Sequence, residues 1–167
     1  TAFTVVTSDG TQYSATLTGG DETNDLAVLK VSGSRVLAES AAMQASFADS
    51  NKVAVLDTAI AIGNPEGAGI AITSGAISVE SEYITMTSTD NSRYVEYRVM
   101  RTDASVNHGN SGGGLFDING KLIGITNAKN VKEETDNICY ALPITLVKYL
   151  MENIRDNMQS NKAGYVS

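Results

Sequence analysis

Short β-type segments separated by turn signals fill residues 1–142, and this pattern constrains the fold more than any other feature. Residues Ala2–Thr7 are rich in β-branched and aromatic side chains, Ser8-Asp9-Gly10 gives a turn, and Gln12–Leu17 returns as a hairpin partner. Further along, Asn119-Gly120 between two apolar segments is a strong two-residue hairpin signal. Many short strands joined by glycine-containing turns predict a β-sandwich or β-barrels.

Periodicity and turn signals together predict nine or ten short strands. The expected strands are Ala2–Thr7, Gln12–Leu17, Leu26–Val31, Lys52–Ile62, Ile70–Val79, Tyr83–Thr87, Tyr94–Arg101, Gly113–Ile118, Lys121–Ala128 and Ile138–Leu142.

The hydrophobic period changes after Pro143. Apolar residues then recur at steps of three and four, which gives one apolar face to a helix that begins just after the proline. We therefore expect a single C-terminal helix. The apolar positions are Val147, Leu150, Met151, Ile154 and Met158.

Charge and cysteine content exclude several classes of function. The formal net charge of the 167 residues is −7, which argues against binding to nucleic acid or to an anionic membrane, because phosphate binding needs clustered Lys and Arg. The single cysteine, Cys139, cannot form an internal disulfide and is expected as a small buried hydrophobe. The carboxylates Asp21, Glu22 and Asp25 lack His or Cys partners and calcium-loop spacing, so we expect no metal site.

The glycine-rich segment around Ser111 has the composition that a serine nucleophile requires. Such a nucleophile needs an exposed hydroxyl on a tight turn and backbone N–H groups aimed at the oxyanion that forms on attack. Gly109, Gly112 and Gly113 allow a sharp turn and the close approach of a substrate carbonyl. The oxyanion hole would lie in Gly109-Asn110-Ser111, formed by the N–H groups of Gly109 and Ser111. Taken alone, such a motif is more often a Gly-rich β-turn that holds an ordinary serine.

Five ordered blocks of the sequence resemble the HtrA/Deg-type serine proteases of the chymotrypsin-like clan. Gly109–Leu115 is similar to the G-N-S-G-G-P-L motif of that family, with Gly114 in the place of its proline, and Thr102-Asp103-Ala104 is similar to the T-D-A lead-in. The resemblance covers about residues 3–158. The remaining blocks are Thr11–Lys30, Ala59–Ser78, Leu122–Asn127 and Ala141–Ile144.

The resemblance implies an all-β fold: two chymotrypsin-like six-stranded barrels and a C-terminal helix. Residues 1–60 would be the remainder of the first barrel, residues 61–142 the second barrel with the nucleophile, and residues 143–167 the helix and tail. The first barrel should be incomplete and leave open strand edges. The stretch Glu80–Arg101 reads longer than its family counterpart and predicts an extended hairpin.

The resemblance also implies roles for individual residues. Asp25 corresponds to the orienting acid of the catalytic triad, and its position before Ser111 fits the chain order His…Asp…Ser. Ser105, six residues before the nucleophile, would lie at the base of the S1 pocket. A serine there argues against a preference for Lys or Arg and favours small or medium aliphatic residues. The expected substrate-lining residues of the strand that follows are Ile125, Thr126 and Asn127.

The catalytic histidine of the family has no counterpart in residues 1–167. His108 lies three positions before Ser111 and would have to fold over its own oxyanion loop, so we do not expect it to act as the base. Three explanations stay open: the chain is an N-terminally truncated fragment, the upstream residues exist outside this sequence, or the protein is a pseudoprotease. The chain alone is expected to be inactive.

The function implied by the resemblance is a serine endopeptidase that acts on unfolded or damaged polypeptides in protein quality control. The family implies a cell-envelope or secreted location, trimer formation and PDZ domains outside this chain, and no metal or cofactor. No signal peptide is recognisable in residues 1–167. The alternative is a catalytically inactive domain of the protease fold that binds peptides.

Overall fold

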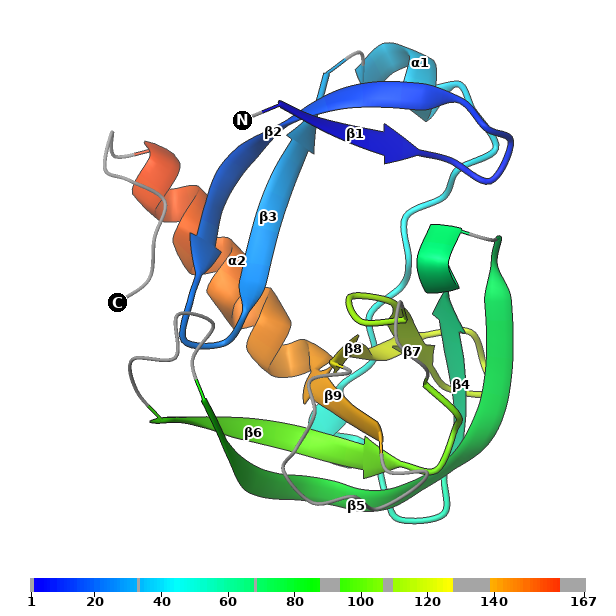
Figure 1. The fold of residues 1–167 in the computed structure, drawn as a ribbon, viewed down its shortest axis with the longest axis vertical. Coiled ribbons are helices and arrows are strands. Elements are labelled where there is room, and N and C mark those ends of the chain that lie inside the picture. The colour runs from blue at the N-terminus through cyan, green and yellow to red at the C-terminus, as the bar shows by residue number, and fades with distance from the viewer. Residues whose placement is uncertain are drawn as a thin grey trace. The chain divides into compact units, whose positions relative to one another are not determined.

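The computed structural model describes residues 2–32, 34–67, 69–87, 94–106, 110–127 and 139–159 (Figure 1). The chain divides into two compact units, each with its own sheet. Unit 1 comprises Thr1–Gln44 together with Lys148–Ser167, and unit 2 comprises Ala45–Val147.

Unit 1 contains a three-stranded antiparallel sheet of order β1-β2-β3. The strands are β1 (Ala2–Val6), β2 (Gln12–Asp21) and β3 (Leu26–Val31). Asp9 closes the turn between β1 and β2, because its Oδ1 accepts hydrogen bonds from Thr7 Oγ1 (2.6 Å) and from the Thr11 N–H (3.0 Å). Both hydrogen bonds lower the pKa of the Asp9 carboxyl, and the bond from Thr7 has the larger effect.

The C-terminal helix α2 (Ile144–Gln159) begins directly after Pro143, as predicted. From Lys148 onward it belongs to unit 1. Three of the apolar positions predicted for its inner face, Val147, Leu150 and Ile154, are buried. No helix of the described residues is long and apolar enough to cross a membrane.

Unit 2 is a closed antiparallel barrel of order β4-β5-β6-β9-β8-β7 (Figure 1). Its core contains small and branched side chains that fill the interior of a six-stranded barrel. The strands are β4 (Thr58–Gly63), β5 (Ala71–Thr87), β6 (Tyr94–Thr102), β7 (Gly114–Phe116), β8 (Leu122–Asn127) and β9 (Cys139–Pro143). The core residues are Ala59, Ala61, Ile77, Met100, Ala104, Leu115, Ile123 and Ala141.

The predicted all-β fold with a C-terminal helix is therefore confirmed, including the six-stranded second barrel and the incomplete first one. Two strand predictions need correction. The strand expected at Lys52–Ile62 begins only at Thr58, because Ser50–Lys52 forms a 3-10 turn capped by Asp49. The two strands expected on either side of residues 80–82 are one 17-residue strand, β5, which absorbs two register shifts against β6.

The change from unit 1 to unit 2 falls between Gln44 and Ala45, before the boundary that we predicted after residue 60. Backbone hydrogen bonds explain the earlier change. Leu122 N–H donates to Ser46 O (2.8 Å) and Ala48 N–H donates to Leu122 O (2.9 Å), so the connecting segment already runs along β8. Between β3 and β4 the chain also forms a short helix, α1 (Ser34–Ala38).

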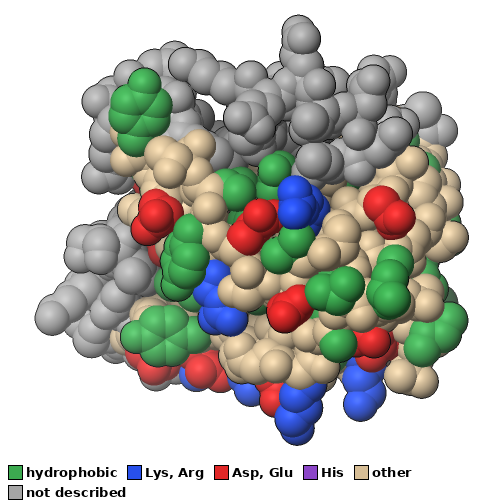
Figure 2. All heavy atoms as spheres, turned by 90° about the horizontal axis from the view of Figure 1, so that it is seen from below, with side chains coloured by type: hydrophobic (Ala, Val, Ile, Leu, Met, Phe, Trp, Pro, Cys, Tyr) green, Lys and Arg blue, Asp and Glu red, His purple; other side chains and the backbone are tan. Residues whose placement is uncertain are grey.

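The surface carries charges of both signs. Figure 2 shows one face of the molecule, on which Lys and Arg, Asp and Glu, and hydrophobic side chains of the described residues are interspersed.

Candidate active site

A tight turn at Asn110–Gly113 presents Ser111 immediately before β7. Ser111 is exposed, whereas the preceding Asn110 is only 5% exposed. The Asn110 carbonyl accepts hydrogen bonds from Gly113 N–H (2.9 Å) and from Thr126 Oγ1 (2.6 Å). Gly112 has φ +83°, a conformation that favours glycine. The turn thus presents an exposed serine directly after a buried residue whose carbonyl is held by two hydrogen bonds.

Strand β8 fixes this turn from one side. Thr126 O accepts from Gly112 N–H (2.8 Å), and Thr126 N–H donates to Gly113 O (2.9 Å). The Thr126 hydroxyl also lies 3.1 Å from Gly113 O. Thr126 is 2% exposed, so its hydroxyl is directed at the turn and not at solvent.

Strand β4 closes against the same turn from another side. A Cβ added to Gly113 would overlap the carbonyl oxygen of Ile62, and one added to Gly63 would overlap Oδ1 of Asn110. The side-chain Oδ1 of Asn110 is buried and has no hydrogen-bond partner among the residues that the structure describes. Glycine at both positions is therefore what permits the backbone of β4 and the turn to pack this closely.

The lead-in segment Thr102–Ser105 is held to β5. Thr102 Oγ1 donates to Ala76 O (2.8 Å), and Asp103 Oδ1 accepts from Ala76 N–H (2.7 Å). Ser105 is exposed, and its carbonyl accepts from Thr73 Oγ1 (2.7 Å). The segment that was predicted to carry the base of the S1 pocket is thus fixed by side-chain hydrogen bonds.

Cys139 ties the end of the lead-in segment to β9. Its Sγ accepts from Val106 N–H (3.1 Å) and donates to Val106 O at 3.7 Å. Burial raises the pKa of the Cys139 thiol. The predicted burial of Cys139 is therefore confirmed, and its thiol also holds the backbone of Val106.

Asp25 lies in unit 1, in the turn between β2 and β3, and is exposed. Its φ of +54° lies in the left-handed region, which costs about 1 kcal/mol for a residue with a Cβ. The turn is stabilised by the buried Asp21, whose carboxylate accepts from Asn24 N–H (3.1 Å) and from Asn24 Nδ2 (2.8 Å). Sequence reasoning had assigned no role to Asp21.

The remaining predicted residues divide between the two units and the undescribed segments. Ser105, Asn110, Ser111, Ile125, Thr126 and Asn127 belong to unit 2, and Asp25 belongs to unit 1. Ile125 is half-buried and Asn127 is 8% exposed. Gly109 and His108 lie outside the described residues. No group of three or more potential metal ligands occurs within the ranges that the structure describes.

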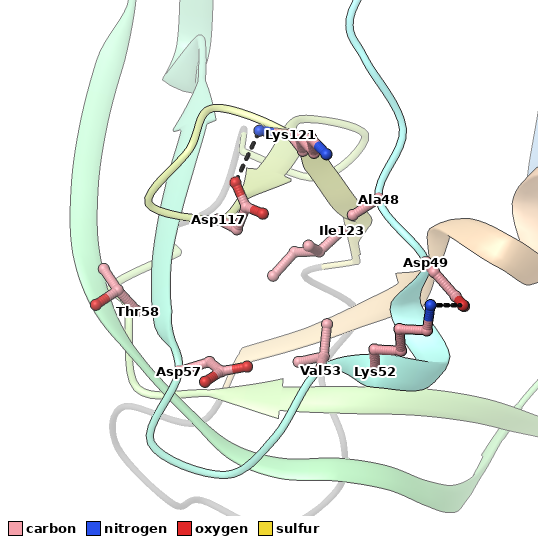
Figure 3. Close-up of a pocket in the computed structure, with 9 residues that line it drawn as sticks. All are labelled: Ala48, Asp49, Lys52, Val53, Asp57, Thr58, Asp117, Lys121 and Ile123. Atoms are coloured by element: carbon pink, nitrogen blue, oxygen red, sulfur yellow. Dashed lines mark hydrogen bonds and ion pairs between the residues drawn. The ribbon is translucent and has the colours of Figure 1, made fainter.

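Unit 2 also has a pocket of about 290 Å³ that contains none of the predicted site residues (Figure 3). Its apolar side is formed by Ala48, Val53 and Ile123. Lys52 lies 3.6 Å from Asp49, and Asp117 accepts from the N–H groups of its own turn. Lys52 and Asp49 thus pair with each other, whereas Asp117 is bonded to backbone N–H groups. The other lining residues are Asp57, Thr58 and Lys121.

The closed barrel and the anchored serine turn define the chymotrypsin-like class of fold. Within it, the chain belongs to the family of the trypsin-like peptidase domain, whose model matches residues 1–125.

Known relatives are similar over nearly all of the chain. A probable periplasmic serine endoprotease, DegP-like, of Rhizobium meliloti is 38% identical over 92% of the chain, and a probable periplasmic serine protease, do/HhoA-like, of Haemophilus influenzae is 39% identical over 91%. A solved structure of a variant of the HtrA-type protease AlgW with a tripeptide superimposes with a TM-score of 0.73 at 32% identity, over 92% of this chain and 47% of that one. The chain spans only 28% and 31% of the two curated relatives.

Proposed function

We propose that this chain is the protease domain of a serine endopeptidase in which Ser111 is the nucleophile. The observation that carries the proposal is the buried anchoring of the turn under an exposed Ser111, in a chain of the trypsin-like peptidase family. Asp25 is the orienting acid, and the N–H groups of Gly109 and Ser111 form the oxyanion hole.

In this mechanism Ser111 Oγ attacks the carbonyl carbon of the scissile peptide bond. A histidine base takes the hydroxyl proton and then delivers it to the leaving amine. Asp25 holds the imidazole in the required tautomer and stabilises its charged form. The oxyanion receives hydrogen bonds from the backbone N–H groups, and one such donor contributes roughly 10²–10³ in kcat.

The histidine base lies outside residues 1–167 in our proposal. The short share of the relatives that this chain spans, 28% and 31%, supports this assignment. His108 lies only three positions before Ser111 in the sequence, and we expect the base to come from a more distant part of the chain. Without the base, Ser111 stays a weak nucleophile and the chain alone is inactive.

The substrates that we propose are polypeptides, in particular unfolded or damaged ones. The exposed Ser105 supplies no charge to an S1 pocket, which favours small or medium aliphatic side chains over Lys and Arg. Ile125 and Asn127 on β8 line the substrate backbone. The names of the relatives support a cell-envelope location, and trimer formation and a PDZ domain outside this chain belong to the same proposal.

A fluorophosphonate probe tests the proposal, because it reacts with an activated serine. We would label the 167-residue chain and a form extended upstream in its gene, each with a Ser111→Ala control. Labelling of the extended form alone, lost in Ser111→Ala, is the expected result. If the extended form carries a histidine in a strand–turn context and still fails to label, the endopeptidase assignment is wrong. Binding of peptides to an unreactive extended form would then establish the inactive peptide-binding domain.

A further inference from the structure

Thr126 makes four polar contacts with the turn that carries Ser111. Two use its backbone, to Gly112 and Gly113, and follow from the pairing of neighbouring chain segments. The other two involve the buried hydroxyl, which lies 2.6 Å from Asn110 O and 3.1 Å from Gly113 O. A hydroxyl has one proton to donate, and the shorter contact indicates that Asn110 O receives it.

The Asn110 carbonyl determines the orientation of the N–H of Ser111. Both groups belong to one planar peptide unit, and in a trans peptide the C=O and the N–H point in opposite directions. The chain contains no cis peptide bond among its described residues. A hydrogen bond that holds the carbonyl of Asn110 toward β8 therefore turns the N–H of Ser111 away from β8.

We propose that Thr126 is a positioning residue, whose hydroxyl fixes the Asn110–Ser111 peptide plane and thereby aims the Ser111 N–H at the developing oxyanion. This inference rests on the proposed function for its catalytic consequence. It replaces the role of Thr126 as a substrate-lining side chain, because the hydroxyl is buried and directed at the turn. The second donor to Asn110 O, Gly113 N–H at 2.9 Å, lies within the turn itself and moves with it.

Substitution of Thr126 isolates the hydroxyl. Thr126→Val removes the hydroxyl and keeps both backbone hydrogen bonds, so the barrel retains its pairing, and Thr126→Ala repeats the loss with a smaller side chain. Thr126→Ser keeps the hydroxyl. Thr145→Val is the matched control, since it removes a threonine hydroxyl that accepts hydrogen bonds from Ser50 N–H (3.2 Å) and Ser50 Oγ (2.9 Å), in the same unit but away from the turn.

The first experiment measures peptide hydrolysis and fluorophosphonate labelling in the upstream-extended protein. Removal of an oxyanion donor lowers kcat by roughly 10²–10³, and a tilted donor loses part of this, so we expect kcat to fall about 10- to 100-fold in Thr126→Val and Thr126→Ala. KM and the preference among P1 residues stay unchanged, and Thr126→Ser and Thr145→Val keep the parental kcat. A raised KM with unchanged kcat, or no loss at all, overturns the proposal.

The second experiment keeps the inference testable if the extended parent proves inactive and the proposed function fails. Amide hydrogen exchange and the ¹⁵N shift of Ser111 are compared in the 167-residue chain. We expect both to change in Thr126→Val and Thr126→Ala and to return to parental values in Thr126→Ser. Parental values in all three variants overturn the positioning role independently of any activity.

Discussion

Gly63→Ala tests whether the close packing of β4 against the turn Asn110–Gly113 fixes the position of Ser111. The added Cβ would overlap Oδ1 of Asn110 and would lie 3.0 Å from the Asn110 Cα. Since the Cα is backbone, rotation of the Asn110 side chain alone does not relieve the contact. The turn itself must move, and with it the peptide that precedes Ser111.

The cost of this overlap can be estimated from overpacked protein cores, where an added methyl group costs about 1–3 kcal/mol. For a domain of this size each kcal/mol lowers Tm by roughly 2–4 °C, so we expect Gly63→Ala to lose about 2–12 °C. Gly120→Ala is the matched control. Its φ of +73° makes the alanine strained, but among the described residues no atom other than those of its chain neighbours lies within 4 Å of the added Cβ.

The assay is thermal and urea unfolding of the 167-residue chain, followed by fluorophosphonate labelling of the upstream-extended form per folded molecule. We expect Gly63→Ala to label more slowly than the parent, and Gly120→Ala to label at the parental rate whatever its stability. Equal labelling rates in both variants would show that β4 does not control the geometry of Ser111. A Gly63→Ala variant as stable as the parent would refute the packing argument itself.

Three further predictions concern side chains outside that contact. Asp21→Ala removes a buried carboxylate that accepts two hydrogen bonds from Asn24, and urea unfolding should show a loss of about 1–3 kcal/mol in the free energy of unfolding, whereas Asn24→Ser should cost less. Asp9 has a lowered pKa, so its folded-state contribution is present above its unfolded pKa and disappears as pH falls through the folded value; Asp9→Asn should flatten the acidic limb of stability against pH. Cys139 should react with iodoacetamide far more slowly in the native chain than in urea at the same pH, because burial raises its pKa, and equal rates would contradict that burial.

The sequence predicts the fold well where local signals and long-range packing agree. Alternation and turn residues located most strands, and the change of period after Pro143 located α2. Lys52–Leu56 was misjudged as strand, because an apolar run does not distinguish a β-strand from a turn whose backbone is bonded by side chains. There Ala54 N–H donates to the Asp57 carboxylate (2.8 Å) and Leu56 adopts φ +73°.

Some features of the site could be predicted from the sequence motif, whereas others depend on how the strands pack. The glycines around Ser111 indicated a tight turn, and the structure places an exposed serine there. The hydroxyl of Thr126 and the close approach of Gly63 could not be predicted, since both depend on which strands of the barrel neighbour the turn. The one available signal was the position of Thr126 in a strand expected beside the substrate.

The two units differ in the number of chain segments that form them. Unit 2 is one uninterrupted segment, Ala45–Val147, whereas unit 1 draws on both Thr1–Gln44 and Lys148–Ser167. During synthesis from the N-terminus, the barrel therefore has all its strands before the ribosome has made the part of α2 that unit 1 needs. The barrel of unit 2, which carries Ser111, can therefore close before the residues of α2 that belong to unit 1 have been synthesised.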